Sequence, residues 1–328
     1  MIFTKLCRPL ILAAVLCAAS LGGSGRTIAE VYPARTVKIV VPFPAGGPLD
    51  ATARLMAEGL SQNLKRPFII ENRPGVAGNV GTEAVAKSAA DGYTLLLVLD
   101  TPLTVNPSLY TKLPFDPERD LVPISLIASF SQMLVVHPSV AANSLADFVA
   151  LAKHHRLTYG SGGTKGSPGH LAMEAFRMRA GFDIVHVAYK GNPQVVADLT
   201  GGHIQAGFLA TPSVIELVRE GKLRGLAVSG SHRTPHAPYV PTVAEADYPD
   251  FEMEFFEVLL GPSGMPPAIR ALLEAQVRRV VGSPNFQERV RAQDLEPIGT
   301  NGVDARDRLK LTAARWKAVI KATNIQPD

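Results

Sequence analysis

The chain has 328 residues, with 33 Lys or Arg against 29 Asp or Glu, 46% hydrophobic residues and two cysteines. This length exceeds what a single hydrophobic core usually spans, so we expect two lobes. The formal net charge of +4 is small. It argues against a nucleic-acid partner, because nucleic-acid-binding proteins normally carry clustered Lys and Arg on a strongly basic domain.

The N-terminus has the order of a secretory signal peptide. Lys5 and Arg8 precede an apolar run at 10–19, and small residues follow it. Such a run is too short for an ordinary membrane helix. We expect residues 1–29 to be the signal peptide, with cleavage after Ala29, and cleavage after Ala19 is the alternative. Such a signal predicts a periplasmic protein.

Removal of this segment changes the composition. It takes away three basic residues and no acidic one, which leaves 30 Lys or Arg against 29 Asp or Glu. Cys7 and Cys17 are removed as well, and Leu16 before Cys17 is a poor match to a lipoprotein signal. The mature chain is therefore predicted to have no disulfide, no thiolate metal site and no cysteine nucleophile.

Short Val, Ile and Leu runs alternate with segments of helical period through the first third of the chain. The predicted strands are 37–41, 68–71 and 95–99, and the predicted helices are 49–64 and 82–88. This alternation indicates mostly parallel strands covered by helices. A nearly polar-free run at 124–136 follows a Pro-rich, charged passage, and we expect it to cross between lobes.

A second alternating series follows the crossing run. Its predicted helices are 145–153, 167–178 and 194–199, and its predicted strands are 157–159, 184–187 and 204–208. Four prolines between 231 and 249 predict an irregular connection. A strand at 255–260 and helices at 267–281, 284–292 and 303–323 complete the chain. We expect one lobe at 30–125, the second at 126–235, and a return to the first at 236–328.

The segment from Val40 to Asp50 leads from a predicted buried strand into a helix. Gly46 and Gly47 allow the backbone to come close to a ligand. Amides at the start of the following helix, with the helix dipole, form a site for an anion of carboxylate or phosphate size. The alternative is an ordinary strand-to-helix turn in which Asp50 is the N-terminal cap.

A second glycine-rich loop, from Tyr159 to His170, also joins a strand to a helix. Its hydroxyls and amides could hold the same anion from the second lobe. It is not a phosphate-binding P-loop, because Lys165 precedes Gly166 and the glycine spacing differs. His170 is a ligand, a base or a helix residue turned toward the core.

Two further interpretations of the polar residues are weak. His154, His155, His232 and His236 lie in polar or Pro-rich sequence without a third ligand, so they define no metal site. A secreted hydrolase or lyase would need Ser161 or Ser167 with His170 and Asp50. Ser167 and His170 lie three residues apart at one helix start, and no third orienting group is evident.

Many short motifs of this chain resemble, in order and spacing, the extracytoplasmic receptors of the tripartite tricarboxylate transporter system, also called Bordetella uptake gene receptors. The similarity covers nearly the whole mature chain. The matching positions are 32–35, 42–47, 71–75, 78, 79, 81, 91–95, 106–110, 166, 167, 170, 171, 189–191, 201, 202, 221–224, 240–242, 245 and 316.

The resemblance implies an α/β protein with a type II periplasmic-binding-protein fold, in which two α/β lobes with a hinge hold a ligand cleft between them. It implies a small carboxylate held by loop amides and bridging waters, with no cofactor and no catalysis. The membrane components of the transporter are the expected partners, a membrane sensor is a further candidate, and a monomer is expected. The implied ligand-binding residues are Phe43, Pro44, Ala45, Gly46, Gly47, Asp50, Thr101, Ser161, Gly163, Thr164, Ser167, His170, Tyr189, Lys190, Phe208 and Leu209.

Two departures from the family pattern bear on ligand identity. Leu209 stands where many relatives carry Asp, so a carboxylate that could meet a ligand ammonium is missing. The second glycine loop is about one residue longer than usual, with Lys165 as an added charge. We therefore expect a ligand without a required ammonium group, such as a dicarboxylate or an aromatic or hydroxy carboxylate.

Overall fold

The computed structural model describes residues 32–163, 165–323 and 325. The described residues from Arg35 onward form one compact unit. The predicted signal peptide at 1–29 lies outside the described residues. No helix among the described residues is long and apolar enough to span a bilayer.

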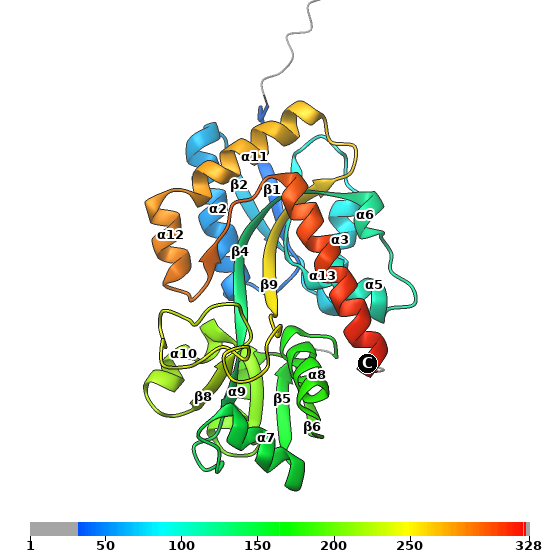
Figure 1. Cartoon of the computed structure of the whole chain (residues 1–328). Coiled ribbons are helices and arrows are strands. Elements are labelled where there is room, and N and C mark those ends of the chain that lie inside the picture. The colour runs from blue at the N-terminus through cyan, green and yellow to red at the C-terminus, as the bar shows by residue number, and fades with distance from the viewer. Residues whose placement is uncertain (1–31, 164, 324, 326–328) are drawn as a thin grey trace, which may run out of the picture. The chain divides into compact units, whose positions relative to one another are not determined.

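The compact unit is built on one ten-stranded sheet with the order β2-β1-β3-β9-β4-β7-β5-β6, in which β8 and β10 also pair with β4 (Figure 1). We use "first half-sheet" for β1, β2, β3, β9 and β10, and "second half-sheet" for β5, β6, β7 and β8. The strands are β1 Val37–Val41, β2 Phe68–Asn72, β3 Thr94–Leu99, β4 Leu121–Val136, β5 Thr158–Gly162, β6 Val185–Tyr189, β7 Ala206–Ala210, β8 Arg224–Val228, β9 Glu254–Pro262 and β10 Glu296–Pro297.

The long strand β4 connects the two half-sheets. Its first part pairs with β9 from Leu121 to Ser131, and its last part pairs with β7 and β8 from Gln132 to Val136. Figure 1 shows β4 and β9 running side by side between the two groups of strands. The prediction that the run at 124–136 crosses between two α/β parts is therefore confirmed.

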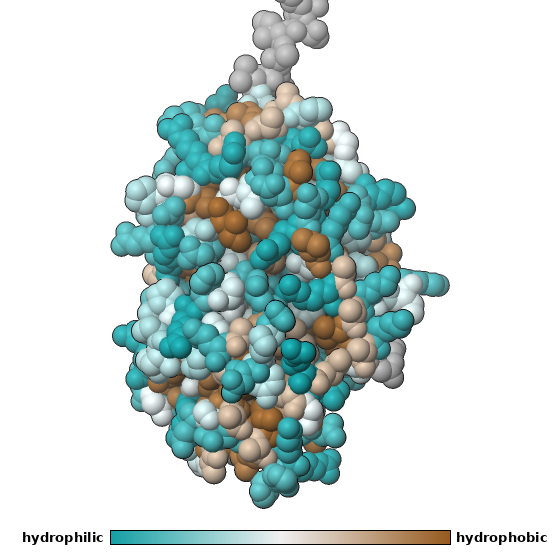
Figure 2. Space-filling view, in the orientation of Figure 1, coloured by the Kyte–Doolittle hydropathy of each residue, from teal (hydrophilic) through white to brown (hydrophobic). Residues whose placement is uncertain are grey.

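Helices cover both faces of the sheet (Figure 1). They are α2 Pro48–Leu64, α3 Asn79–Ala86, α4 Thr101–Thr104, α5 Asn106–Leu109, α6 Pro117–Asp120, α7 Leu145–His154, α8 Pro168–Ala180, α9 Asn192–Thr200, α10 Thr211–Arg219, α11 Pro267–Val281, α12 Pro284–Arg291 and α13 Gly302–Thr323, with a 3-10 turn η1 at Val76–Gly78. The longer of these helices bury apolar side chains, such as Leu60 of α2, Phe176 of α8 and Val277 of α11. Figure 2 shows a mostly hydrophilic surface with scattered apolar residues on the visible face.

Two apolar clusters hold the second half-sheet between its helices. One contains Phe176 of α8 and Phe208 of β7, and it continues to Trp316 of α13. The other contains Leu209 of β7 and Val214 of α10. Successive residues of β7 thus enter opposite clusters, as expected for a strand whose side chains alternate between two covered faces.

The structure differs from the sequence prediction in three ways. The parallel pairs are limited to β1 with β2 and β3 and to β5 with β6 and β7, whereas β4 and β9 are antiparallel to their neighbours. The helices α4, α5, α6 and α10 and the strands β8 and β10 had not been predicted. Strand β5 also extends through Gly162, so Ser161 lies on a strand rather than in a loop.

Candidate functional site

The loop between β1 and α2 is organised by Asp50, which is only 4% exposed. Its carboxylate accepts hydrogen bonds from the Gly46 amide at 3.0 Å and from the Asn72 side chain at 2.9 Å. Arg54 adds two more, from Nε at 2.9 Å and from Nη2 at 3.2 Å. Asn72 also donates to the Phe43 carbonyl at 3.1 Å, so one buried carboxylate and one amide fix the course of the loop.

These contacts decide the charge state and the role of Asp50. Burial by itself raises the pKa of Asp50, but the hydrogen bonds from Arg54, the Gly46 amide and Asn72 outweigh it and hold that pKa below its usual value. The carboxylate is therefore ionised and fully engaged. Asp50 shapes the loop, and the Gly46 amide, predicted to be a ligand donor, donates to Asp50 in this structure.

Gly46 and Gly47 differ in what their positions require. Gly46 has φ +85°, a left-handed conformation that favours glycine. Gly47 is the N-cap of α2 with φ −81° and ψ 169°, and no side chain caps this helix. A Cβ at Gly47 would meet only the Pro44 carbonyl oxygen, at 3.9 Å. The helix start is thus open toward a ligand, while Pro44 and Ala45 are exposed.

On the second half-sheet, the structure brings together residues that lie far apart in sequence. Ser161 Oγ lies 2.7 Å from Nε2 of His186, on the neighbouring strand β6. Ser167 Oγ, at the start of α8, lies 3.5 Å from Ser161 Oγ. The His186 ring stands 4.3 Å from the His170 ring, and both lie beside Tyr159. His186 was missed by the sequence analysis, because only the pairing of β5 with β6 reveals it.

The arrangement does not support the hydrolase interpretation. His170 Nδ1 accepts the Gly166 amide at 3.0 Å, so this nitrogen is not a base for a serine. Ser161 is fully buried and cannot meet a substrate from solvent without a rearrangement. The oxygens of Asp50 are bonded to Gly46, Arg54 and Asn72, and none of these contacts orients a histidine.

Glycines let three segments of the second half-sheet meet closely. A Cβ at Gly162 would lie 2.3 Å from the Asn192 amide nitrogen at the start of α9. A Cβ at Gly169 would lie 2.1 Å from the Phe208 carbonyl oxygen. Asn192 Nδ2 donates to Ser213 Oγ near the start of α10 at 3.3 Å. The first turns of α8, α9 and α10 therefore gather at one edge of the half-sheet.

The Tyr189–Lys190 turn lies at the end of β6, and its contacts in this structure are within the second half-sheet and α9. The Tyr189 hydroxyl donates to Asp198 of α9 at 2.6 Å, and burial together with this bond raises the pKa of Tyr189 to about 12. Lys190 is exposed. The Gly163 amide donates to the Tyr189 carbonyl at 2.8 Å, and Thr164 lies outside the described residues. The Tyr189 hydroxyl is thus directed to α9.

Phe208 and Leu209 do not provide ligand-facing side chains in this structure. Both are fully buried: Phe208 packs edge-on against Phe176, and Leu209 belongs to the cluster between β7 and α10. The structure therefore places the Leu209 side chain in the core, and its role in ligand binding stays a prediction. The physical reason is that α8 packs on one face of β7, through Phe176, and α10 packs on the other, through Val214.

Two buried acids lie near the ends of the central strands of the first half-sheet. Asp100 precedes Thr101, which is itself buried, and accepts the Phe256 amide at 3.2 Å. Burial raises the pKa of Asp100 to about 7. Glu257 on β9 has one carboxyl oxygen without a hydrogen-bond partner among the described residues, and burial raises its pKa to about 8. Neither acid was identified from the sequence.

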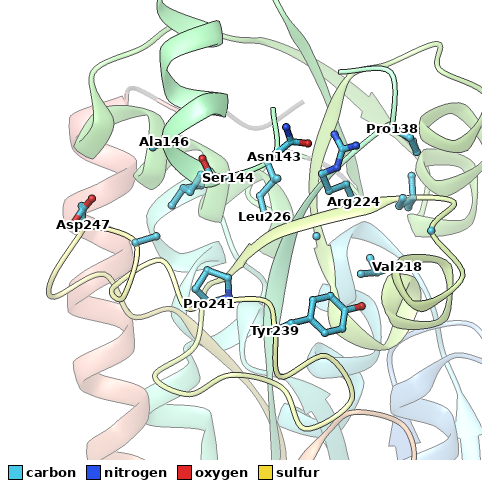
Figure 3. Close-up of a pocket in the computed structure, with 15 residues that line it drawn as sticks. Pro138, Asn143, Ser144, Ala146, Val218, Arg224, Leu226, Tyr239, Pro241 and Asp247 are labelled. Atoms are coloured by element: carbon cyan, nitrogen blue, oxygen red, sulfur yellow. The ribbon is translucent and has the colours of Figure 1, made fainter. Parts of the chain in front are cut away.

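A cavity of about 630 Å³ lies away from all these residues (Figure 3). Its lining includes Leu145 of α7, Arg224 of β8 and the exposed Tyr239. Arg224 Nη1 donates to the carbonyls of Val140 and Ala142 at 3.1 and 3.0 Å, which ties β8 to the loop before α7. No predicted site residue lines this cavity, so it does not mark the predicted ligand site.

Metal chemistry finds no support in the described part of the chain. Within residues 32–163 and 165–323, no three His, Cys, Asp or Glu side chains come together to hold a metal ion. His232 instead lies 2.9 Å from the Ser231 hydroxyl, and His236 lies 2.9 Å from the Arg291 carbonyl oxygen. These histidines serve the irregular connection between β8 and β9.

The chain is similar to known receptors over almost its whole length. It is 36% identical over 308 residues to BugT of Bordetella pertussis, covering 93% of this chain and 94% of that protein. An R. palustris protein solved with adipate is 34% identical, with a TM-score of 0.83, and the match covers 90% of this chain and 100% of that chain. MatC from Rhodopseudomonas palustris with bound malate is 27% identical, with a TM-score of 0.77, and covers 88% of this chain and 100% of that chain.

The structural matches confirm the predicted α/β binding-protein fold. The model of the tripartite tricarboxylate transporter family receptors, named TctC, matches residues 52–325. That range contains most of helix α2, the second glycine loop and the strands β4 and β9. The chain belongs to the TctC family of tripartite tricarboxylate transporter receptors.

Proposed function

We propose that this receptor captures a small carboxylate between the β1–α2 loop and the helix starts of the second half-sheet, and delivers it to a tripartite tricarboxylate-type membrane transporter. One observation carries the proposal. The helices α2, α8, α9 and α10 follow the carboxyl ends of β1, β5, β6 and β7, and all four begin without a side-chain cap. Their first-turn amides and dipoles favour an anion.

Some other helices show the contrast, whereas α3, α4, α5 and α11 likewise begin without a side-chain cap. The start of α7 has a capping box between Ser144 and Asp147, and Ser283 caps α12. These side chains take up the first-turn amides, whereas glycine, serine and alanine at the four helix starts above leave them to water or a ligand. Relatives solved with adipate and with malate support a carboxylate as the anion.

The proposed division into lobes follows the half-sheets, except that residues 237–253 pack against the second half-sheet. Residues 30–125 and 236–328 form one lobe, 126–235 form the other, and closure around the ligand completes the set of donors. The segment at 1–29 directs export and is then cleaved off. The mature protein acts as a monomer in the periplasm and has no catalytic activity. A membrane sensor that recognises the closed form is a further partner.

Calorimetry with adipate and malate, each compared with its diamide, tests the function. We expect the carboxylates to bind at least tenfold more tightly, or by about 1.4 kcal/mol, because only they carry the charge that the helix starts favour. Small-angle scattering should show a smaller radius of gyration with the bound acid. Equal affinity for acid and amide would refute the anion site.

The absence of turnover is tested separately. The same acids and a set of small esters should remain unchanged after prolonged incubation with the protein. Product formation that scales with protein concentration and disappears in Ser161→Ala would show that the contact of Ser161 with His186 is catalytic, and would refute the proposal of a binding protein.

A further inference from the structure

Gln132 occupies the point at which β4 passes from one half-sheet to the other. Ser131 pairs with Glu254 of β9, whereas Gln132 pairs with Ala210 of β7. On the edge of β4 that faces away from β7, Ser229 holds the backbone of Gln132. Gln132 N donates to Ser229 Oγ at 2.9 Å, and Ser229 N donates to Gln132 O at 2.8 Å. The backbone of Gln132 is therefore held on both sides, by β7 and by Ser229.

The Gln132 side chain has an unused donor. The residue is 2% exposed, and its Nε2 has no hydrogen-bond partner among the described residues. A buried donor left unpaired destabilises the protein, because it has lost its hydrogen bonds to water. Such groups in native proteins call for an explanation, and an ordered water or a ligand are the usual ones.

The side chain of Gln132 reaches the start of α8. Gln132 and Leu134 lie on the same face of β4 by alternation, and Leu134 pairs with Phe208. The first turn of α8 covers this face, since a Cβ at Gly169 would lie 2.1 Å from the Phe208 carbonyl oxygen and 3.6 Å from Gln132 Oε1. The carboxamide of Gln132 thus lies beside the first turn of a 13-residue helix that no side chain caps.

Most groups at this place can donate hydrogen bonds. Nε2 of Gln132 and the first-turn amides of α8 are donors, and Ser167 adds a hydroxyl, whereas Oε1 of Gln132, the atom nearest Gly169, is an acceptor. A ligand oxygen that accepts hydrogen bonds would satisfy Nε2 and the helix start together. A methyl group or an aromatic edge would leave Nε2 unpaired.

We propose that Gln132 determines ligand specificity by donating from Nε2 to a second oxygen-bearing group of the ligand, remote from the carboxylate at the β1–α2 loop. This inference rests on the proposed carboxylate-binding function. The ligand class that it selects is one with oxygen acceptors at both ends, such as a dicarboxylate. A monocarboxylate of the same chain length meets only the first anion site.

The test uses two matched pairs of probes, succinate with butyrate and adipate with hexanoate, measured by calorimetry. In the wild type we expect the dicarboxylate of at least one pair to bind at least tenfold more tightly than its monocarboxylate. Gln132→Leu should abolish most of this preference while leaving the monocarboxylate affinity unchanged. Gln132→Glu should weaken the dicarboxylate further, because it places an acceptor, and at neutral pH a charge, opposite the second carboxylate.

Stability without ligand separates this role from a structural one. Gln132→Leu should unfold at the same or a higher denaturant concentration than the wild type, because it removes a buried unpaired donor. The control is Gln205→Leu, since Gln205 Oε1 accepts from Thr158 N and Oγ1, both at 2.8 Å. Gln205→Leu should lower stability and keep the preference for dicarboxylates.

Each contrary result has its own meaning. A preference that survives in Gln132→Leu overturns the specificity role, and so does a loss of stability as large as that of Gln205→Leu. An equal loss of affinity for both members of a pair assigns Nε2 to a structural water and also overturns the proposal. Failure of the wild type to bind any of the four acids refutes the carboxylate function itself.

Discussion

Gly166 and Leu109 lie so close that a Cβ on Gly166 would stand 2.1 Å from Leu109 Cδ1. Gly166 belongs to the second glycine loop. Leu109 is the last residue of α5, which lies between β3 and β4 in the chain. Gly166 also has φ +87°, and its amide donates to His170. One glycine therefore permits both the loop conformation and the contact between parts that are 57 residues apart in the chain.

Gly166→Ala should lower the free energy of unfolding by about 1–3 kcal/mol through overpacking, in addition to about 1 kcal/mol from its positive φ. Gly181→Ala is the matched control, because Gly181 has φ +70° at the end of α8 and a Cβ there would meet no neighbouring atom within 4 Å. In a Leu109→Ala background the Gly166→Ala penalty should shrink toward that of the control. Additive penalties in denaturant titrations would show that the contact is not responsible.

Gly47→Val should weaken carboxylate binding at least tenfold and cost little stability. The extended backbone of Gly47 suits a β-branched residue, and only the Pro44 oxygen lies within 4 Å of a Cβ there. The added side chain would instead occupy the approach to the start of α2. Calorimetry with adipate and malate measures the loss, and Gly47→Ala should give a smaller one. Unchanged affinity in a folded Gly47→Val protein would exclude this loop from the site.

Asp50→Asn should destabilise the β1–α2 loop and reduce ligand affinity without any direct contact to the ligand. The amide removes the charge that faces Arg54 and cannot accept all four hydrogen bonds, which costs about 1–3 kcal/mol. Because the pKa of Asp50 is lowered in the folded state, its contribution is present above the usual Asp range and is lost as the pH falls through the folded pKa. The stability difference between wild type and Asp50→Asn should therefore narrow in acid, as measured by urea titrations at several pH values.

Glu257→Gln should make the protein more stable than the wild type in mildly alkaline buffer. The pKa of Glu257 is raised to about 8, so the folded protein keeps a proton that the unfolded chain releases above about pH 4.5. Wild-type stability should consequently fall as the pH rises toward 8, and the variant should lack this part of the decline. Urea titrations at pH 5 and pH 9 measure it, with the exposed Glu288→Gln as control. Parallel pH profiles for wild type and Glu257→Gln would contradict the buried-acid interpretation.

The sequence alone identified the elements whose pattern is local. Ala53, Met56 and Leu60 recur at helical spacing, and all three are buried on one side of α2 as predicted. The nearly polar-free run before His137 became the crossing strand β4, most of whose residues are apolar because both faces of the strand are covered. The order and spacing of short motifs also indicated the family.

Only the tertiary structure decided which side chains meet. Asn72 binds the carboxylate of Asp50 across 22 positions, and His186 reaches Ser161 across 25. These contacts depend on strand register, which hydrophobic periodicity does not specify for a strand covered on both faces. Leu209 and Gln132 show the same limit of the sequence. Alternation along a strand predicts that neighbouring residues point to opposite sides, but it does not say which helix covers each side. In the structure Leu209 is enclosed beneath α10, and Gln132 faces the first turn of α8.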